Sequence, residues 1–199
     1  MRLVWLFLRS RLAGPALAGI ALTALLAVAW ERWFGHEPEA MTAAMILFPL
    51  VVACVIGTGA HSAFGETELT ASLSLPLLRG VYLAGLIAVG ALALLLAALA
   101  WTLPDDGGTL ARNLAGLSGL ALLAAPVVGG RLSWIVPVTL AMAAQLLAIS
   151  DLPSWLALTW PQASFDNDRA LALALGLLGS GLAAVHVFGP KVARDEAAG

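Results

Sequence analysis

Long apolar runs with almost no charge alternate with short polar connectors along this chain of 199 residues. A helix rises about 1.5 Å per residue and the hydrocarbon core of a bilayer is about 30 Å thick, so about 20 apolar residues cross it. The pattern predicts six membrane spans and leaves no room for a separate soluble domain. The spans are Leu12–Trp30, Met41–Gly59, Gly80–Trp101, Asn113–Gly129, Arg131–Ile149 and Ala170–Phe188.

The composition agrees with a helical membrane protein. Hydrophobic residues make up 61% of the chain and charged residues 11%, against about 45–50% and about 25% in soluble domains. The runs are continuous and rich in Leu and Ala, which favours helices over the alternating segments of a transmembrane barrel. We therefore predict an all-α, polytopic protein with a single transmembrane domain over residues 1–199. The net charge of −2 gives no indication of nucleic-acid binding.

Four prolines fall within the predicted spans. Pro15 lies in a first helical turn, where its missing N–H costs little. Pro49, Pro126 and Pro137 are predicted to be interior and to kink their helices. A neighbouring helix can then supply the donor for each carbonyl that these prolines leave without one.

The distribution of Lys and Arg predicts the orientation, because these residues favour cytoplasmic connectors. With a cytoplasmic N-terminus, seven basic residues lie inside and three outside, so both termini are predicted to be cytoplasmic. The inside residues are Arg2, Arg9, Arg11, Arg79, Arg131, Lys191 and Arg194, and the outside residues are Arg32, Arg112 and Arg169. The tryptophans predicted to form an aromatic belt on the outer side are Trp30, Trp33, Trp101, Trp155 and Trp160.

The first residues mix arginines with apolar side chains. The apolar run that follows is longer than the usual 7–15 residues of a secretory signal, so we expect it to be a retained span. Met1–Arg11 has two interpretations that the sequence leaves open. It is either a short amphipathic helix in the inner interface or an extension of the first span anchored by positive charge.

The connector His61–Arg79 is too long for a hairpin turn. Gly65 interrupts the chain, and Glu66 and Glu68 follow where carboxylates favour the positive end of a helix dipole. Leu69 and Leu73 then form one apolar face, and Pro76 is expected to end the helix. The sequence leaves two interpretations open for this connector: a short amphipathic helix on the cytoplasmic surface that acts as a docking surface, or a solvated loop that rests on the headgroups.

The connector Ser150–Arg169 is too apolar for a free loop but too short in its apolar part to cross the membrane. We predict an interfacial or half-inserted segment on the outer side. Asp166, Asn167 and Asp168 precede the sixth span. Their oxygens suit Ca²⁺, but the spacing of a calcium-binding helix–loop–helix is missing, so a helix cap is the favoured interpretation and no metal site is predicted.

Polar residues within the predicted spans are few. No acid falls within a span, which argues against a proton- or sodium-coupled carrier. His186 lies near the inner end of the sixth span and Gln145 in the outer half of the fifth. The lone Cys54 is expected to be a small hydrophobic residue rather than a reactive thiol. The chain has no HExxH, GxSxG or GxxxxGK[ST] motif, so we predict that it is not an enzyme and does not itself hydrolyse ATP.

This layout resembles the membrane subunit of ATP-binding-cassette (ABC) exporters of the type-2 permease family. The resemblance rests on six spans, a GETE sequence between the second and third, and a partly apolar segment before the sixth. It implies that Met1–Arg11 is a connecting helix and that Ser150–Asp168 is an outer re-entrant segment. It also implies a cytoplasmic coupling helix that docks into an ATPase. The residues of this implied docking site are Gly65, Glu66, Thr67, Glu68, Leu69 and Leu73.

The resemblance also implies the partners and the location. A separate nucleotide-binding ATPase subunit would carry ATP and Mg²⁺, and this chain would bind no cofactor. A second copy of the chain or a paralogous permease would complete the membrane part, in contact with lipid. Closure of the ATPase pair on ATP would move the coupling helices and open a path outward. The Ala-, Leu- and Gly-rich composition favours a bacterial plasma membrane.

Two other functions fit the same sequence. One is an accessory or scaffold subunit of a larger membrane complex, since such a protein also needs no buried charge. The other is a membrane enzyme acting on lipid, for which the sequence offers only His61, Glu66 and Glu68 without a recognised spacing. No residue selects a substrate.

Overall fold

The computed structural model describes residues 13–34, 37–61, 74–100, 106–149, 159–164 and 166–189. In these ranges it contains α-helices and one short 3-10 helix but no strand, so the prediction of an all-α protein is confirmed for them. The elements are α2 (Ala13–Phe34), α3 (Pro38–Gly59), α5 (Ser74–Ala98), α6 (Asp106–Val128), α7 (Ile135–Ile149), η1 (Trp160–Gln162) and α9 (Asp168–Phe188).

Five of these helices, α2, α3, α5, α6 and α9, are long and apolar enough to cross a membrane. They contain 21 to 25 residues and are therefore about 31 to 37 Å long. This is typical of a multi-pass membrane protein. The predicted span Arg131–Ile149 differs, because residues 131–134 form a turn. The 15 residues of α7 that follow reach only about 22 Å, so a sixth span is not confirmed and stays a prediction.

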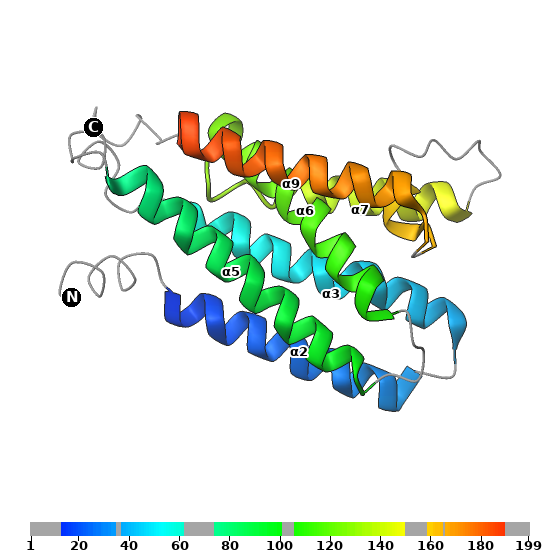
Figure 1. The fold of residues 1–199 in the computed structure, drawn as a ribbon. Helices are drawn as coiled ribbons and strands as arrows, with labels where there is room; N and C mark the ends of the chain where they lie inside the picture. The colour runs from blue at the N-terminus through cyan, green and yellow to red at the C-terminus, as the bar shows by residue number, and fades with distance from the viewer. Residues whose placement is uncertain are drawn as a thin grey trace, which may run out of the picture.

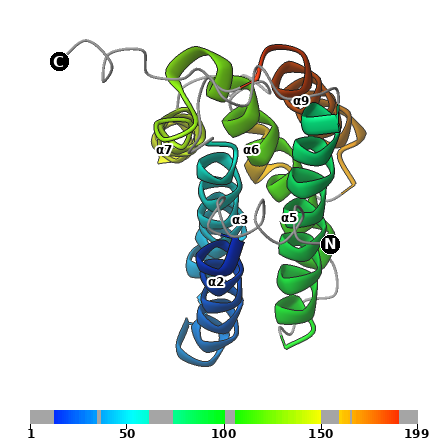
Figure 2. The same cartoon turned by 90° about the vertical axis from the view of Figure 1, so that its left-hand side faces the viewer.

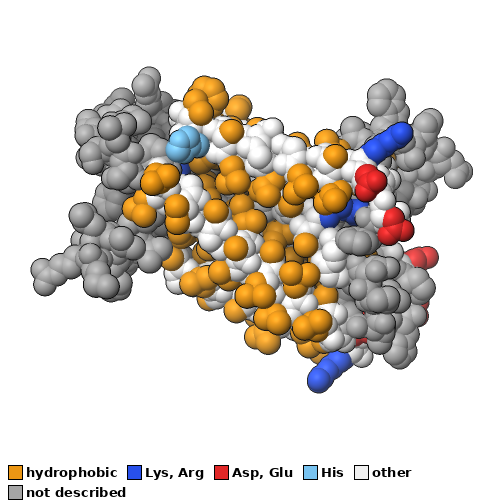
Figure 3. Space-filling view, in the orientation of Figure 1, with side chains coloured by type: hydrophobic (Ala, Val, Ile, Leu, Met, Phe, Trp, Pro, Cys, Tyr) orange, Lys and Arg blue, Asp and Glu red, His pale blue; other side chains and the backbone are white. Residues whose placement is uncertain are grey.

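The helices run alternately between two ends of the bundle (Figure 1). We call the end at which α2 begins and α9 ends the terminal end, and the opposite end the acidic end. The described carboxylates gather on the helix ends and turns of the acidic end. They belong to Glu31, Glu37, Glu39, Asp166 and Asp168. Between the two ends the surface is largely hydrophobic, as one face of the molecule shows in Figure 3.

Helix α6 is the centre of the bundle. It contacts α3, α5, α7 and α9, and Figure 2 shows it between α7 and α9. Of its apolar span 67% is buried, compared with 17% for α2 and for α9. The contact with α9 is so close that it leaves no room for a side chain at two glycines. A Cβ at Gly119 would overlap the backbone of Leu177, and a Cβ at Gly181 would overlap the carbonyl of Gly119. Small residues allow this approach of two membrane helices.

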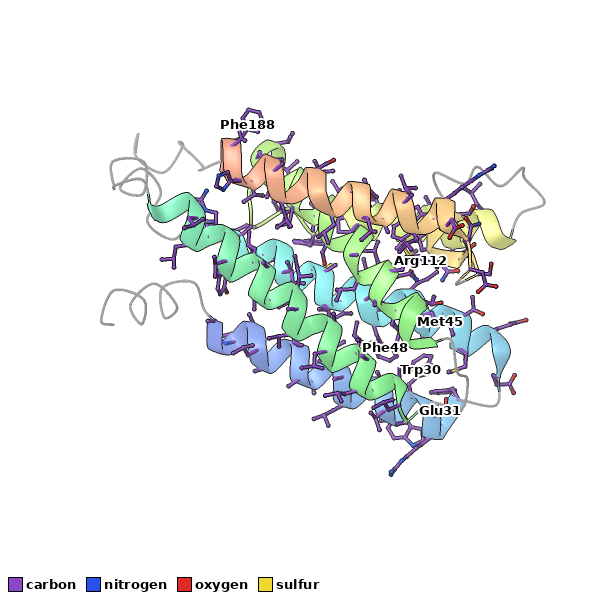
Figure 4. The ribbon with its side chains drawn as sticks, viewed as in Figure 1. Trp30, Glu31, Met45, Phe48, Arg112 and Phe188 are labelled. Atoms are coloured by element: carbon purple, nitrogen blue, oxygen red, sulfur yellow. The ribbon has the colours of Figure 1, made fainter. Side chains whose placement is uncertain are left out.

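Helices α2 and α3 are joined by an aromatic contact at the acidic end. The ring of Trp30 lies edge-on to Phe48 with centroids 5.9 Å apart, and both are labelled in Figure 4. The indole N–H of Trp30 donates to the carbonyl of Ala40 at 3.2 Å. Trp33 is exposed on the same end, which fits its predicted place in an aromatic belt.

Several predicted boundaries are wrong. Helix α6 begins at Asp106, seven residues before the predicted start at Asn113. Helix α5 begins at Ser74, so Pro76 lies in its first turn and does not end a preceding helix. Pro137 is the third residue of α7 and is not interior. In each case the change in hydropathy does not coincide with the first residue of the helix. The first turns of α5 and α7 tolerate proline, and buried partners can satisfy the polar side chains in the first turns of α6.

Candidate functional site

The docking residues implied by the family resemblance lie outside the described residues. They are Gly65, Glu66, Thr67, Glu68, Leu69 and Leu73. The described ends nearest to them are His61, just after α3, and Ser74, at the start of α5. Met1–Arg11 also lies outside the described residues.

The most polar buried site in the described part of the chain lies at the acidic end of α6. We call it the clamp. It consists of the side chains of Arg112 and Asn113 and the backbone carbonyls of Met45, Pro161, Ala163 and Ser164. Arg112 and Met45 are labelled in Figure 4 at this end of the bundle. The clamp thus joins α6 to α3 and to residues 159–164, which we call the cap segment.

Arg112 binds the cap segment through its guanidinium group. Nη1 donates to the carbonyl of Ser164 at 2.8 Å, and Nη2 donates to that of Ala163 at 2.9 Å. A longer bond of 3.4 Å joins Nη2 to the carbonyl of Pro161. The residue is only 3% exposed, and each of its described hydrogen bonds ends on a neutral oxygen. A buried cation with this set of acceptors orders the backbone that supplies them.

Asn113 connects three elements. Its Oδ1 accepts from Nε and Nη2 of Arg112, each at 3.3 Å. Its Nδ2 donates to the carbonyl of Met45 in α3 and to that of Pro161 in the cap segment, both at 2.9 Å. The carbonyl of Met45 needs this donor, because Pro49 has no N–H for the usual i to i−4 bond. The prediction that a neighbouring helix supplies a donor next to an interior proline is confirmed at Pro49.

Trp160 anchors the cap segment by packing. Its side chain is fully buried, and a Cβ at Gly116 of α6 would overlap the indole ring. Glycine at this position therefore provides the space for the ring. Pro161 is also buried. A tryptophan of this size brings a large apolar area into the bundle, which stabilises the position of the segment.

The cap segment is also tied to α7. Nε2 of Gln162 donates to the carbonyl of Ala144 at 3.0 Å and to Oε1 of Gln145 at 3.3 Å. The cap segment therefore contacts α3, α6, α7 and α9 through a stretch of only six residues. Residues 159–164 are the described part of the predicted half-inserted segment, whose depth in a membrane stays a prediction.

The turn before α9 is a helix cap. Oδ1 of Asn167 accepts from the backbone N–H groups of Arg169 and Ala170, both at 3.1 Å. Asp168 follows in the first turn, where its charge favours the helix dipole. The helix-cap interpretation of Asp166–Asp168 is confirmed. No set of three or more His, Cys, Asp or Glu side chains suited to a metal ion was found in the described residues.

Two predictions fail at the clamp. Arg112 was expected in an outside connector, but it lies inside α6 and is buried, because carbonyls of the cap segment replace the water it would have in a loop. Trp160 was expected in an interfacial belt, but it is buried against Gly116. Asn113 was treated only as the first residue of a span. The one sequence signal for it was Pro49, which required a donor from elsewhere.

The clamp holds backbone through hydrogen bonds. It contains a cation, an amide and carbonyls, and it includes no carboxylate, imidazole or thiol. Comparison with protein-family models, with curated proteins and with solved structures finds no match to this chain. The function is therefore argued from the chain's own residues.

Proposed function

We propose that this chain is the membrane subunit of an ABC exporter, which forms the substrate path with a second permease chain and is moved by a separate ATPase. The observation that carries the proposal is the arrangement around residues 62–73. Helix α3 ends and α5 begins at the terminal end of the bundle, where α2 begins and α9 ends (Figure 1). The two helices that flank the GETE sequence therefore have their adjoining ends at the terminal end.

The basic residues of the whole sequence support the same orientation, with seven in the segments predicted to be inside and three, Arg32, Arg112 and Arg169, in those predicted to be outside. Arg79 and Arg131 lie at the terminal end, and the described part of that end carries no carboxylate. The described acids are at the opposite end. Because basic residues favour the cytoplasmic side, the terminal end is the cytoplasmic one in this proposal. An ATPase in the cytosol then reaches residues 62–73, as its docking to Glu66 and Glu68 requires.

Affinity capture tests the proposal. The tagged full-length chain is expressed in its own host, extracted in mild detergent and captured, and a nucleotide-binding ATPase is expected to co-purify. The variant Glu66→Ala plus Glu68→Ala is expected to lose most of that ATPase while the chain still inserts in the membrane. Glu37→Ala plus Glu39→Ala is the matched control, because it removes the same charge from exposed residues at the acidic end.

Three results contradict the proposal. One is the absence of any ATPase in the wild-type capture, which favours an accessory subunit. Another is undiminished ATPase with the Glu66 and Glu68 variant. The third comes from labelling intact cells with an impermeant thiol reagent, in variants that also carry Cys54→Ala. Glu37→Cys is expected to react from outside, and His61→Cys is expected not to react. Reaction of the His61 position from outside contradicts the proposed orientation.

A further inference from the structure

The side-chain amide of Asn113 connects α3 directly to the cap segment. Both of its N–H groups are used, one on the carbonyl of Met45 and one on the carbonyl of Pro161. Arg112 binds the cap segment to α6 but makes no described bond to α3. The two neighbouring residues therefore connect the cap segment to different helices.

The chemistry of the clamp fixes the orientation of this amide. A guanidinium group has donors and no acceptor, so the atom of Asn113 that faces Arg112 must be the oxygen. The nitrogen then faces two carbonyls, which accept only. Rotation of the amide would oppose donor to donor and acceptor to acceptor. Asn113 is fully buried, so water is not at hand to relieve such a mismatch.

Because Met45 belongs to α3, this connection can pass a movement of α3 to the cap segment. Helix α3 runs the whole length of the bundle, from the acidic end to the terminal end (Figure 1). Pro49 removes one bond from its ladder, and Asn113 binds the carbonyl that this leaves. A shift of α3 along or across the bundle therefore acts on the cap segment through this amide, which is held in one orientation. Apolar contacts alone allow sliding.

We propose that Asn113 is a positioning residue that makes α3 and the cap segment move as one unit. The cap segment is then no free lid: it follows α3 and stays docked on α6. This inference rests on the proposed function for the source of the motion, which would be an ATPase acting at the terminal end. The mechanical connection itself is a property of the chain and is tested without an ATPase.

The test measures a distance between the two connected elements. Spin labels are attached at Thr58→Cys, on the exposed face of α3 near the terminal end, and at Ser164→Cys, exposed in the cap segment. The purified full-length chain carries Cys54→Ala and is held in lipid nanodiscs. Pulsed electron paramagnetic resonance then gives the distribution of distances between the labels. A single narrow population is expected for the chain with native Asn113.

Asn113→Leu removes the bridge with little change in side-chain size. The narrow population is expected to be lost, because α3 and the cap segment then vary independently. Thr23→Val is the matched control, since it also replaces a buried polar side chain with an apolar one of similar size. The hydroxyl of Thr23 bonds only within α2, to the carbonyl of Gly19. The control is therefore expected to keep the narrow population.

A second variant keeps the test decisive if Asn113→Leu folds poorly. Asn113→Asp at pH 8 retains an acceptor for Arg112 but has no donor for Met45 or Pro161, and the same loss is expected. A narrow, unshifted population in either folded variant overturns the inference, as does an equal loss in Thr23→Val. These outcomes are independent of the capture experiment, so a failure of the exporter proposal is recognised separately.

Discussion

Helix α6 contacts α9 and the cap segment in two contrasting ways. Against α9 the contact is backbone to backbone, with Gly119 and Gly181 leaving no room for a Cβ. Against the cap segment the contact is made by long polar side chains, with Arg112 and Asn113 donating to carbonyls. The contact with α9 depends on the absence of side chains, whereas the hydrogen bonds to the cap segment depend on their presence.

The difference follows from what each partner presents. A helix satisfies its own N–H and C=O groups, so a second helix gains only from close packing, which small residues permit. The cap segment has irregular backbone whose carbonyls lack helical partners. Irregular backbone at membrane depth is tolerated where protein supplies the missing hydrogen bonds. The cation and the amide of α6 do this, and they explain why a costly buried arginine is found there.

The strongest way to break the first interface is Gly119→Ala. The added methyl group overlaps the backbone of Leu177, which cannot move aside as a flexible side chain does. We expect a loss of about 3 kcal/mol, the upper part of the range for overpacking. Thermal unfolding in detergent measures it. Gly176→Ala in α9 is the matched control, because nothing lies within 4 Å of its added Cβ. It should gain up to about 1 kcal/mol from helix propensity, and an equal loss in both variants would contradict this account.

The second interface is broken by Arg112→Met, which keeps apolar bulk but leaves the carbonyl of Ala163 without its donor and that of Ser164 with only the backbone N–H of Asn167. We expect a loss of about 2 kcal/mol, about 1 for each of the two short hydrogen bonds lost. Arg169→Met removes the same charge from an exposed position and should change the stability by less than about 0.5 kcal/mol. Similar values for the two variants would mean that the clamp contributes no more than a surface charge.

Gly116→Ala distinguishes packing from hydrogen bonding within the second interface. The methyl group overlaps the ring of Trp160, and we expect a loss of about 1–2 kcal/mol. Adding Trp160→Leu makes room, so the double variant should lose about 1 kcal/mol less than the sum of the two single variants. Strict additivity in a double-mutant cycle would show that the two side chains do not compete for this space.

The smallest effect is expected beside the cap segment, at the start of α9. Asn167→Ala removes the acceptor for the N–H groups of Arg169 and Ala170, at a cost of about 1 kcal/mol. Asn167→Ser keeps a capping oxygen and should lose much less. If the alanine variant is as stable as the serine variant, the cap does not determine where α9 begins.

Hydropathy predicted the helical class and most of the spans, because long apolar runs have few other stable arrangements in this chain. The span Ala170–Phe188 matches α9 to within two residues, and Met41–Gly59 shares its last residue with α3. The same criterion failed at Arg112, since a hydropathy window assigns charge to a connector. Arg112 lies in α6 because its acceptors come from residues 49 to 52 positions later, a relation that no local window contains.

Only part of the candidate site could be predicted from the sequence, because its partners are also far apart along the chain. Pro49 indicated that one carbonyl needed an outside donor, but nothing in the sequence named Asn113 as its source. Trp160 was recognised as too apolar for a free loop, and the half-inserted prediction followed from that. Its burial depended on Gly116, a glycine that the sequence does not distinguish from the others in the spans.

The position of Arg112 also has a consequence for the biosynthesis of the chain. It lies six residues into α6, or about 9 Å from the start of that helix. When α6 leaves the ribosome, the carbonyls that will bind its guanidinium group have not been synthesised. Until they are synthesised the charge lacks these acceptors, and a buried cation without acceptors is costly, so we expect it to stay near water or lipid phosphate. We therefore expect Arg112 to reach its buried position only after translation of the cap segment.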